Sequence, residues 1–424
     1  MKMLIKNGYV LDPKSHIEGF YDILIEHDTI VEVAPDISVE ADQILDAQGR
    51  YVMPGFIDLH VHLREPGFEY KETIQSGAMA AAKGGFTSIC PMPNTKPSTD
   101  CAEIVQYILH KGKEEAVVHI LPVGAITIGQ NGTKLSDIAD MKKAGIYALS
   151  EDGKSVMETD LYMEAMYMAK ELQLPVLAHC EDRELVRGGV MNAGKKSEEL
   201  GLKGITNAVE DVIVARDILM AKEAGCHLHL CHCSTKDSVE LVAMAKKMGV
   251  SVTAEVCPHH FAMSDDEIKM DHGNFKMNPP LRSMEDVKAL KQGLKDGIMD
   301  CIATDHAPHG YEENDQSMKN APFGIVGLET AFALTMTELV RTGYLTPMEM
   351  VEKLSVNPAR VLNIDKGSLE VGKKADIVIA DPNKEYYIDV NEFASKGRNT
   401  PFHGKKVVGQ VMTTIVDGKV VFNR

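Results

Sequence analysis

The alternation of apolar, β-branched runs with helical stretches through the middle of the chain is the feature that most constrains the fold. Eight such runs occur between residues 55 and 304, and helical patterns lie between most of them. Repeated strand–helix units favour parallel strands joined by helical crossovers. The runs are Gly55–His60, Phe86–Met92, Val117–Thr127, Gly145–Ser150, Leu174–His179, His227–His232, Ser251–Val256 and Asp300–Thr304.

Eight units of this kind predict an α/β fold built around a (β/α)8 TIM-type barrel with insertions. A doubly wound open sheet is the alternative. It is disfavoured because no Gly-rich phosphate or dinucleotide loop follows the first run. The clearest predicted helices are Tyr70–Lys83, Cys101–Glu115, Asp160–Leu172, Glu210–Ala224 and Lys236–Met248.

Both ends of the chain have the pattern of short strands joined by turns, and neither end alone has enough strands for a stable domain. We therefore expect one small composite β-sandwich domain formed by both termini, with residues 1–52 and 362–424 flanking a barrel at 53–361. The expected strands are Lys2–Tyr9, Tyr21–Glu26, Thr29–Val33, Asp42–Asp46, Ala375–Ala380, Lys405–Asp417 and Lys419–Phe422.

Composition excludes several classes of partner. The net charge of −17 argues against nucleic acid or an anionic membrane. No apolar run approaches the ~20 residues of a membrane span, and polar residues interrupt the first fourteen positions, so no signal peptide is expected. The eight cysteines in a long chain without an export signal favour reduced thiols and a cytoplasmic protein.

The first predicted strand ends in His-Val-His. Side chains two residues apart in a strand share a face, so His60 and His62 point the same way. At the C-terminal end of a barrel strand, that face looks into the mouth where barrel active sites lie. Two adjacent imidazoles supply half of a transition-metal site. Taken alone, the pair is equally compatible with two polar residues at a strand end.

Three other strand ends decide between these alternatives, because each carries a metal-ligand residue type. They are His179, His232 and Asp305, which end the fifth, sixth and eighth strands. C-terminal strand ends of a barrel converge on one site, so we predict a metal centre. Asp152 ends the fourth strand, and its carboxylate could bridge two ions, although the same residue before Gly153 could be a simple turn residue.

The complete predicted set is binuclear. His60, His62 and Asp305 hold one ion, His179 and His232 hold the other, and Asp152 bridges them. Such a centre lowers the pKa of bound water and polarises a carbonyl. A structural zinc site at Cys231–Cys233 is disfavoured because no second cysteine pair has suitable spacing. The remaining candidates are expected to be packing or supporting residues, with His227 and His229 against helices: His227, His229, His259, His260 and His306.

Four segments together resemble the dihydroorotases, a family of cyclic amidohydrolases within the amidohydrolase superfamily, with the long bacterial class most similar. The resemblance covers essentially the whole chain. The segments are His60–Gly67 (His-Val-His-Leu-Arg-Glu-Pro-Gly), Pro93–Thr95, Asn278–Arg282 and Asp305–His309.

The resemblance implies a zinc-dependent enzyme with two Zn²⁺ per subunit that interconverts N-carbamoyl-L-aspartate and (S)-dihydroorotate in pyrimidine (UMP) biosynthesis. Asp305 is then the catalytic acid–base. Many cyclic amidohydrolases bridge their metals with a carboxylated lysine, whereas this chain offers Asp152, as the long dihydroorotases do. The implied substrate contacts are Arg64, Asn94 and His309 for the carboxylate, and Asn278, Phe323 and Gly324 for the ring.

Alternatives stay open at this stage. Singly, Arg64 could form a surface ion pair, Asn94 could cap a turn and Asn278 could be a pre-proline loop residue. A hydantoinase or allantoinase is the nearest rival activity. An inactive homologue that scaffolds aspartate transcarbamoylase is a rival of another class, although it should lack the metal ligands. A homodimer is expected from the family, and association with aspartate transcarbamoylase is compatible with it.

Overall fold

The computed structural model describes residues 2–424 and confirms the predicted barrel. Its strands pair in parallel, and most of them are shorter than the apolar runs that predicted them. They are β6 (Phe56–Val61), β7 (Phe86–Pro91), β8 (His119–Ile120), β9 (Val123–Ala125), β10 (Ala148–Ser150), β11 (Val176–Ala178), β14 (Leu228–Leu230), β15 (Val252–Val256) and β16 (Cys301–Ile302).

Strands β8 and β9 are two halves of the third barrel strand. β8 pairs with β7, whereas β9 pairs with β10. Between them, the Leu121 amide donates to Ile89 O (2.9 Å), and Pro122 O accepts from the Tyr147 amide (2.9 Å). Because proline has no N–H to give to a ladder, the strand is interrupted there but its direction is kept. Counted in this way, the barrel has the eight predicted strands.

The barrel closes between its first and last strands. Val61 forms a parallel bridge with His306, and the His62 amide donates to His306 O (2.8 Å). Below this bridge the buried Asp58 carboxylate accepts from the amides of His60 (3.0 Å) and Thr304 (3.1 Å) and from the Thr304 hydroxyl (2.6 Å). The two strands that carry predicted ligands are thus fixed to each other.

Asp58→Ala is expected to destabilise the fold by about 3 kcal/mol, because it leaves two buried N–H groups without an acceptor. Burial raises the pKa of Asp58 to about 7, so asparagine, which resembles the protonated acid, should cost far less. Urea unfolding of the two variants, followed by circular dichroism, measures the difference. Equal midpoints for the alanine and asparagine variants would contradict this role for Asp58.

Helices cover the barrel, and several of them start at a side chain that accepts from an amide of the first turn. Before α1, the Thr73 side chain accepts from the Ser76 amide, and Gly85 ends the helix in a left-handed conformation (φ 89°). The helices are α1 (Ile74–Gly84), α2 (Ala102–Glu115), α3 (Ile138–Ala144), α4 (Thr159–Glu171), α5 (Arg183–Val186), α6 (Lys195–Leu200), α7 (Ala208–Ala224), α8 (Lys236–Lys247), α9 (Pro258–Ala262), α10 (Met284–Lys295), α11 (Tyr311–Asn314), α12 (Ala331–Thr335), α13 (Pro347–Val351) and α14 (Asn357–Val361).

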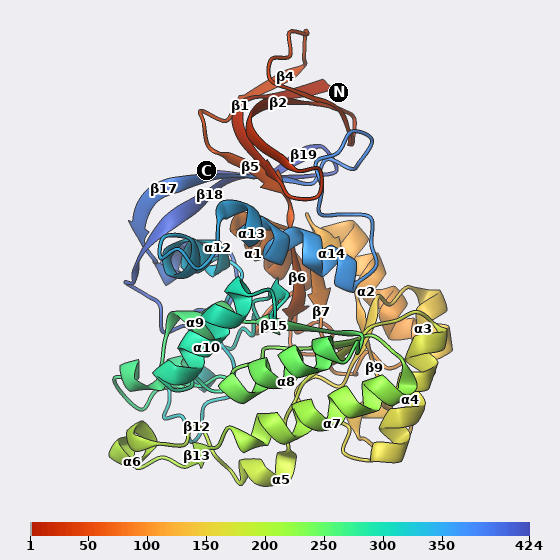
Figure 1. The fold of residues 1–424 in the computed structure, drawn as a ribbon, viewed down its shortest axis with the longest axis vertical. Coiled ribbons are helices and arrows are strands. Elements are labelled where there is room, and N and C mark those ends of the chain that lie inside the picture. Colours follow the sequence, from red (N-terminus) through yellow and green to blue (C-terminus); the bar gives the residue numbers. More distant parts are fainter. Residues whose placement is uncertain (1) are drawn as a thin grey trace.

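Strands from both termini form one eight-stranded sheet, as expected for a composite domain. Figure 1 shows the N-terminal strands in red and the C-terminal strands in blue at one end of the molecule, with β17 and β18 beside α12. The expected sandwich is built from a single curved sheet. Apolar side chains from strands of both termini form one core, and others on the same sheet, such as Met53 and Val378, pack into the barrel core. The strands are β1 (Lys2–Asp12), β2 (Ile17–Glu26), β3 (Thr29–Ala34), β4 (Gln43–Asp46), β5 (Tyr51–Pro54), β17 (Ile377–Tyr387), β18 (Lys406–Val416) and β19 (Lys419–Asn423).

Strand β5 was not predicted, although it connects the two ends of the chain. It pairs in parallel with β1 and antiparallel with β17, placing Ile377 opposite Pro54. β6 begins two residues after β5 ends, so the chain passes directly from the terminal sheet into the barrel. A separate two-stranded ribbon, β12 (Met191–Asn192) with β13 (Gly204–Ile205), lies in the excursion after β11.

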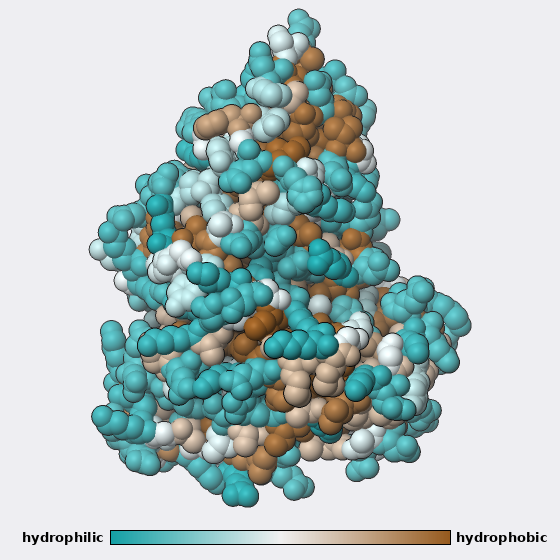
Figure 2. All heavy atoms as spheres, in the orientation of Figure 1, coloured by the Kyte–Doolittle hydropathy of each residue, from teal (hydrophilic) through white to brown (hydrophobic). Residues whose placement is uncertain are grey.

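Hydrophilic residues cover most of the face seen in Figure 2, with hydrophobic patches on the terminal sheet and over the helices below it. Within residues 2–424 no helix is both long enough and apolar enough to cross a membrane. All eight cysteines are free, and seven of them are buried.

Candidate active site

The six predicted metal ligands lie together at the C-terminal ends of the barrel strands, and Asp152 is at the centre of the group. Its Oδ1 lies 3.2 Å from His60 Nε2, 3.5 Å from His179 Nδ1 and 3.9 Å from His232 Nε2. Its Oδ2 lies 3.6 Å from His62 Nε2. One carboxylate that faces four imidazoles has the arrangement of a bridging ligand rather than of a turn residue.

Asp305 faces His60 and His62 from the end of the neighbouring strand, β16. Its Oδ1 lies 3.1 Å from His62 Nε2 and 3.5 Å from His60 Nε2. On the other side, His179 Nδ1 and His232 Nε2 approach each other to 2.9 Å. Two neighbouring groups of candidate ligands are therefore present. His60, His62 and Asp305 form the first group, and Asp152, His179 and His232 form the second.

Buried polar atoms that lack partners support a metal at this place. His60 Nε2, which lies 3.2 Å from Asp152 Oδ1, is buried without a hydrogen-bond partner. On His179 and His232 it is the nitrogen other than the one nearest Asp152 that is buried and unpartnered (Nε2 and Nδ1). Such atoms are costly unless something else binds them. The ligand atoms of His60, His62 and Asp305 lie within 4.8 Å of one another, as do those of His60, Asp152 and His232. Imidazole and carboxylate are the ligands that Zn²⁺ and similar ions prefer.

The charges in this cluster oppose the effect of burial. Burial alone would raise the pKa of Asp152, but the nearby His60, His179 and His232 hold the pKa of that carboxyl well below its usual range. The same opposition, with His60 and His62 as the nearest imidazoles, lowers the pKa of Asp305. Both carboxylates are therefore ionised at neutral pH and can bind a cation or accept a proton.

Glu255, on β15, supports the site and was missed in the sequence. Its Oε1 lies 3.4 Å from His60 Nδ1 and accepts from the His232 amide (3.2 Å), while its Oε2 lies 2.9 Å from His229 Nε2. His229 therefore points toward Glu255, so the expectation that it packs against helices was wrong. The sequence did contain an indication of this role, because a glutamate inside an apolar strand, such as Glu255, needs a buried partner. Carboxylates behind ligating histidines fix the orientation of their rings.

His306 is a supporting residue, as expected. Its Nε2 lies 3.3 Å from Glu72 Oε2, and its Nδ1 accepts from the Gly327 amide (3.1 Å). His260 Nε2 lies 3.0 Å from Pro279 O. Neither histidine is within the group around Asp152.

Three site residues have backbone conformations that non-glycine residues rarely adopt. The φ angles are 62° for Arg64, 35° for His232 and 48° for Asp305. Left-handed conformations cost free energy and persist where surrounding contacts impose them, which is common at functional sites. Here the strained turns lie immediately after β6, β14 and β16, where each strand must aim a side chain into the barrel mouth.

A cavity of about 170 Å³ opens over the carboxylates. The predicted substrate residues that line it are Arg64, Asn94, Asn278, Phe323 and Gly324. Asn94 also supports the metal ligands: its Nδ2 donates to Asp152 Oδ2 (3.0 Å), and its Oδ1 lies 2.9 Å from His62 Nδ1. Asn278 donates to the Glu181 carboxylate.

His309 does not line this cavity but lies directly behind it. Its Nε2 is 2.8 Å from Phe323 O and 3.4 Å from an Arg64 terminal nitrogen. Asn399, from the segment after β17, accepts from the His309 amide (3.1 Å) and donates to Ala307 O and Gly324 O (2.9 Å each). A residue of the C-terminal segment thus holds the substrate-side loops together, which the sequence did not indicate.

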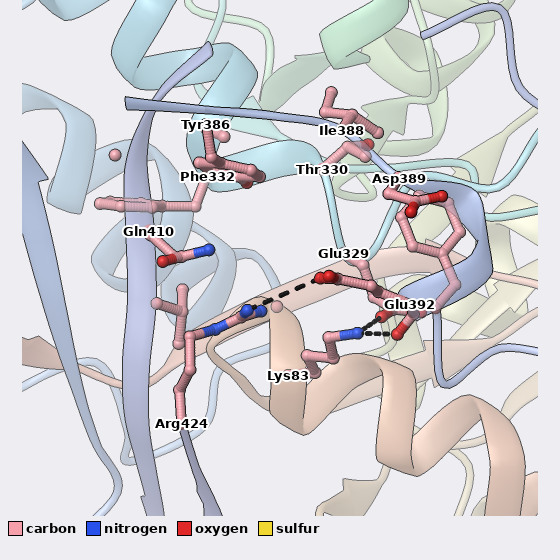
Figure 3. A pocket seen from close by; sticks show the side chains of 15 residues that line it. Lys83, Glu329, Thr330, Phe332, Tyr386, Ile388, Asp389, Glu392, Gln410 and Arg424 are labelled. Carbon is pink, nitrogen blue, oxygen red and sulfur yellow. Dashed lines mark hydrogen bonds and ion pairs between the residues drawn. The ribbon is translucent and has the colours of Figure 1, made fainter. Parts of the chain in front are cut away.

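Ion pairs beside α1 anchor this segment. Figure 3 shows a small pocket of about 30 Å³ in which Lys83 and Glu329 meet, with Nζ and Oε2 2.9 Å apart. Glu329 also accepts from the amides of Ala394 (2.9 Å) and Ser395 (3.1 Å). The pocket contains none of the candidate site residues, so its contribution is to fix the chain that leads to Asn399.

The fold and the site define a class of protein. Over residues 287–422 the chain matches the family model described as "Amidohydrolase family". A solved structure with the same fold is an L-hydantoinase from Arthrobacter aurescens, with a TM-score of 0.90, 26% identity and coverage of 99% of this chain and 96% of that one. A dihydropyrimidinase from Brevibacillus agri has a TM-score of 0.87 at 24% identity and covers 100% and 95%. The chain is an amidohydrolase of the barrel type, and its His/Asp groups indicate a metal cofactor.

Sequence relatives identify the family within that class. Residues 49–238 match the model described as "Dihydro-orotase-like". Dihydroorotases from Acetivibrio thermocellus and Pelotomaculum thermopropionicum are 49% and 50% identical, and each alignment covers 99% of this chain and 98% of the relative. One from Staphylococcus epidermidis is 48% identical over 99% of both chains. The chain belongs to the dihydroorotase family.

Proposed function

We propose that this chain is a zinc-dependent dihydroorotase that reversibly cyclises N-carbamoyl-L-aspartate to (S)-dihydroorotate and water in UMP biosynthesis. One observation carries the proposal: Asp152 lies among four histidines, with Asp305 opposite and Arg64 in the same cavity. The cavity therefore combines a metal-ligand cluster with a guanidinium that can bind the carboxylate common to both reactants. Family membership at about half identity over the whole chain supports the same reaction.

Six residues would hold two Zn²⁺ ions. His60, His62 and Asp305 would bind one ion, His179 and His232 the other, and Asp152 would bridge them. When bound, such ions polarise a carbonyl and lower the pKa of water toward neutrality. The unpartnered imidazole nitrogens and the ionised carboxylates fit this assignment.

Asp305 would move the proton. Hydrolysis adds water to the ring amide carbonyl and breaks its bond to the ring nitrogen. Asp305 is ionised and lies in the cavity, so it can take the proton from the attacking water and deliver it to the leaving nitrogen. In the cyclisation direction, the same residue takes the proton from the ureido nitrogen and helps water to leave.

Arg64 would bind the substrate carboxylate. Its Nε donates to Pro308 O (3.2 Å), which orients the guanidinium, and planar carboxylates pair with arginine through two parallel hydrogen bonds. Asn94 lines the same cavity and His309 Nε2 lies 3.4 Å from Arg64, while Asn278, Phe323 and Gly324 line the part of the cavity that would contact the ring.

Arg64→Met is expected to raise KM for dihydroorotate about 10- to 100-fold, because a hydrogen bond to a charged group contributes about 1.5–3 kcal/mol. The kcat should change much less, since Arg64 does not exchange a proton with the reacting atoms. Steady-state kinetics in both directions provide the measurement. Arg183→Met, at an exposed position, is the matched control. An unchanged KM in Arg64→Met would exclude the proposed carboxylate contact.

Turnover assays distinguish this activity from its rivals. The purified protein should convert dihydroorotate and N-carbamoyl-L-aspartate but not hydantoin or allantoin. The aspartate at position 152 and the Arg64 guanidinium favour dihydroorotate over those neutral rings. Preferential hydrolysis of hydantoin would overturn the proposal, and a lack of any turnover with metal present would favour an inactive scaffold.

We also propose a cytoplasmic location and a homodimer, with residues 53–361 as the catalytic unit between the two parts of the terminal sheet. Eight free thiols are consistent with a reducing compartment. Association with aspartate transcarbamoylase is compatible with this function. Size-exclusion chromatography with light scattering, with and without that enzyme, tests both assemblies.

A further inference from the structure

The ring of His309 must carry a hydrogen on Nε2. This nitrogen lies 2.8 Å from the backbone carbonyl oxygen of Phe323. A carbonyl oxygen can only accept, so the imidazole has to donate. In a neutral ring the other nitrogen, Nδ1, then has a lone pair and requires a donor.

Lys71 is that donor. Its Nζ lies 3.2 Å from His309 Nδ1 and 3.0 Å from Glu313 Oε1, while Glu313 Oε1 itself lies 3.4 Å from Nδ1. The ammonium therefore stands between a lone pair and a carboxylate and donates to both. Lys71 is largely buried, with 13% of its side chain exposed, and its Nζ lies 5.5 Å from the centre of the Tyr70 ring.

The charges around His309 favour its neutral form. Arg64 approaches from the loop after β6, Lys71 from the loop before α1, and Glu313 from α11. Burial of the ring, together with Arg64 and Lys71, lowers the pKa of His309 to about 3, against the opposing effect of Glu313. The ring is thus uncharged at neutral pH although an anion lies close to it.

We infer that Lys71 is a positioning residue that fixes His309 as a neutral Nε2–H donor beside Arg64. This inference rests on the proposed function and adds a residue to its carboxylate-binding edge. Lys71 does not line the cavity over the metal ligands, so it acts through His309. Its effect is to keep the Nε2–H on Phe323 O, in the wall of the cavity, so that Nε2 offers Arg64 no lone pair. The Arg64 guanidinium, 3.4 Å away, then stays free to meet a substrate carboxylate.

Removal of the Lys71 ammonium should leave the Glu313 carboxylate free to act on Nδ1 of His309. In Lys71→Met, the carboxylate faces Nδ1 directly and favours a hydrogen there. Near pH 8 part of the ring would then hold its hydrogen on Nδ1, and KM should rise about tenfold with kcat nearly unchanged. Loss of the Lys71 charge also raises the pKa of the ring, so lowering the pH protonates the variant ring more readily than the wild-type ring and restores Nε2–H. The ratio of the variant KM to the wild-type KM should therefore fall with falling pH.

A second substitution separates this effect from simple damage. In Lys71→Met/Glu313→Gln the carboxylate is gone, so KM at pH 8 should return most of the way toward the wild-type value and lose its extra pH dependence. Lys319→Met, at an exposed position, is the control. A tenfold KM increase that is independent of pH and is not rescued by Glu313→Gln would show a structural role only and overturn the inference, as would an unchanged KM in Lys71→Met.

Nuclear magnetic resonance gives a readout that needs no substrate. The enzyme, loaded with Zn²⁺ and carrying ¹⁵N-labelled histidine, should show the Nε2–H form of His309, assigned by its loss in His309→Gln. Lys71→Met should shift that signal toward the Nδ1–H or doubly protonated form. A wild-type ring with its hydrogen on Nδ1 overturns the inference. If the Nε2–H form is present but dihydroorotate is not turned over, the proposed function fails and the role of Lys71 as a substrate-positioning residue falls with it.

Discussion

Asp305→Asn is expected to lower turnover about 10³-fold in both directions, the size of effect that a positioned general acid–base supplies. Asparagine has the same shape, and its carbonyl oxygen can replace Oδ1, which lies 3.1 Å from His62 Nε2 and 3.5 Å from His60 Nε2. The amide cannot accept a proton and return it. The loss should therefore appear in kcat rather than in KM, because Arg64 still binds the carboxylate.

Metal content must be measured in the same samples, because Asp305 is also a proposed ligand. Elemental analysis of wild type and variant, each loaded with Zn²⁺, distinguishes the loss of proton transfer from the loss of an ion. Asp266→Asn, at an exposed position, is the matched control. A variant that keeps its metal and works within tenfold of wild type would remove Asp305 from the acid–base role.

The barrel could be predicted because its signals are local. Each barrel strand is a short apolar run, and each predicted ligand ends such a run or comes within two residues of its end, as His60 ends the first run and Asp305 follows Thr304. Parallel strands then bring these ends together whatever the details of the loops. Strand β5 could not be predicted this way, because Tyr51–Pro54 has only four residues and its two partners, β1 and β17, lie far apart in the sequence.

The supporting residues were hidden for a similar reason. Asn399 lies 90 residues after His309 and acts through backbone atoms of two other loops, so no spacing rule connects it to the site. The alternation of side chains along the strand predicted that His229 packs against helices. That prediction was wrong, because the direction of this buried histidine depends on its partner, Glu255, on the neighbouring strand. The two roles of Asn94 likewise depend on the side chains of His62 and Asp152, which come from different strands.

Removal of one metal site is the second large effect expected. The wild-type protein should bind two Zn²⁺ ions per chain, and His179→Asn/His232→Asn should retain at most one, because these two imidazoles, which approach Asp152 Oδ1 and each other, are the proposed ligands of the second ion. Activity should fall by at least about 10²-fold, since a site built for two ions loses the second positive charge that helps to hold the attacking water and the carbonyl. Metal analysis after gel filtration, with kinetics on the same fractions, provides the measurement.

Chelation of the wild-type protein tests the same site without a substitution. Dialysis against a chelator should abolish turnover, and two equivalents of Zn²⁺ should restore it, whereas the double variant should not recover at any Zn²⁺ concentration. His110→Asn is the control, because the His110 side chain is 69% exposed and lies outside the site. If the double variant retains two ions, His179 and His232 are not ligands. If the wild type works fully after its metal has been removed, the cluster around Asp152 serves the fold and not the reaction.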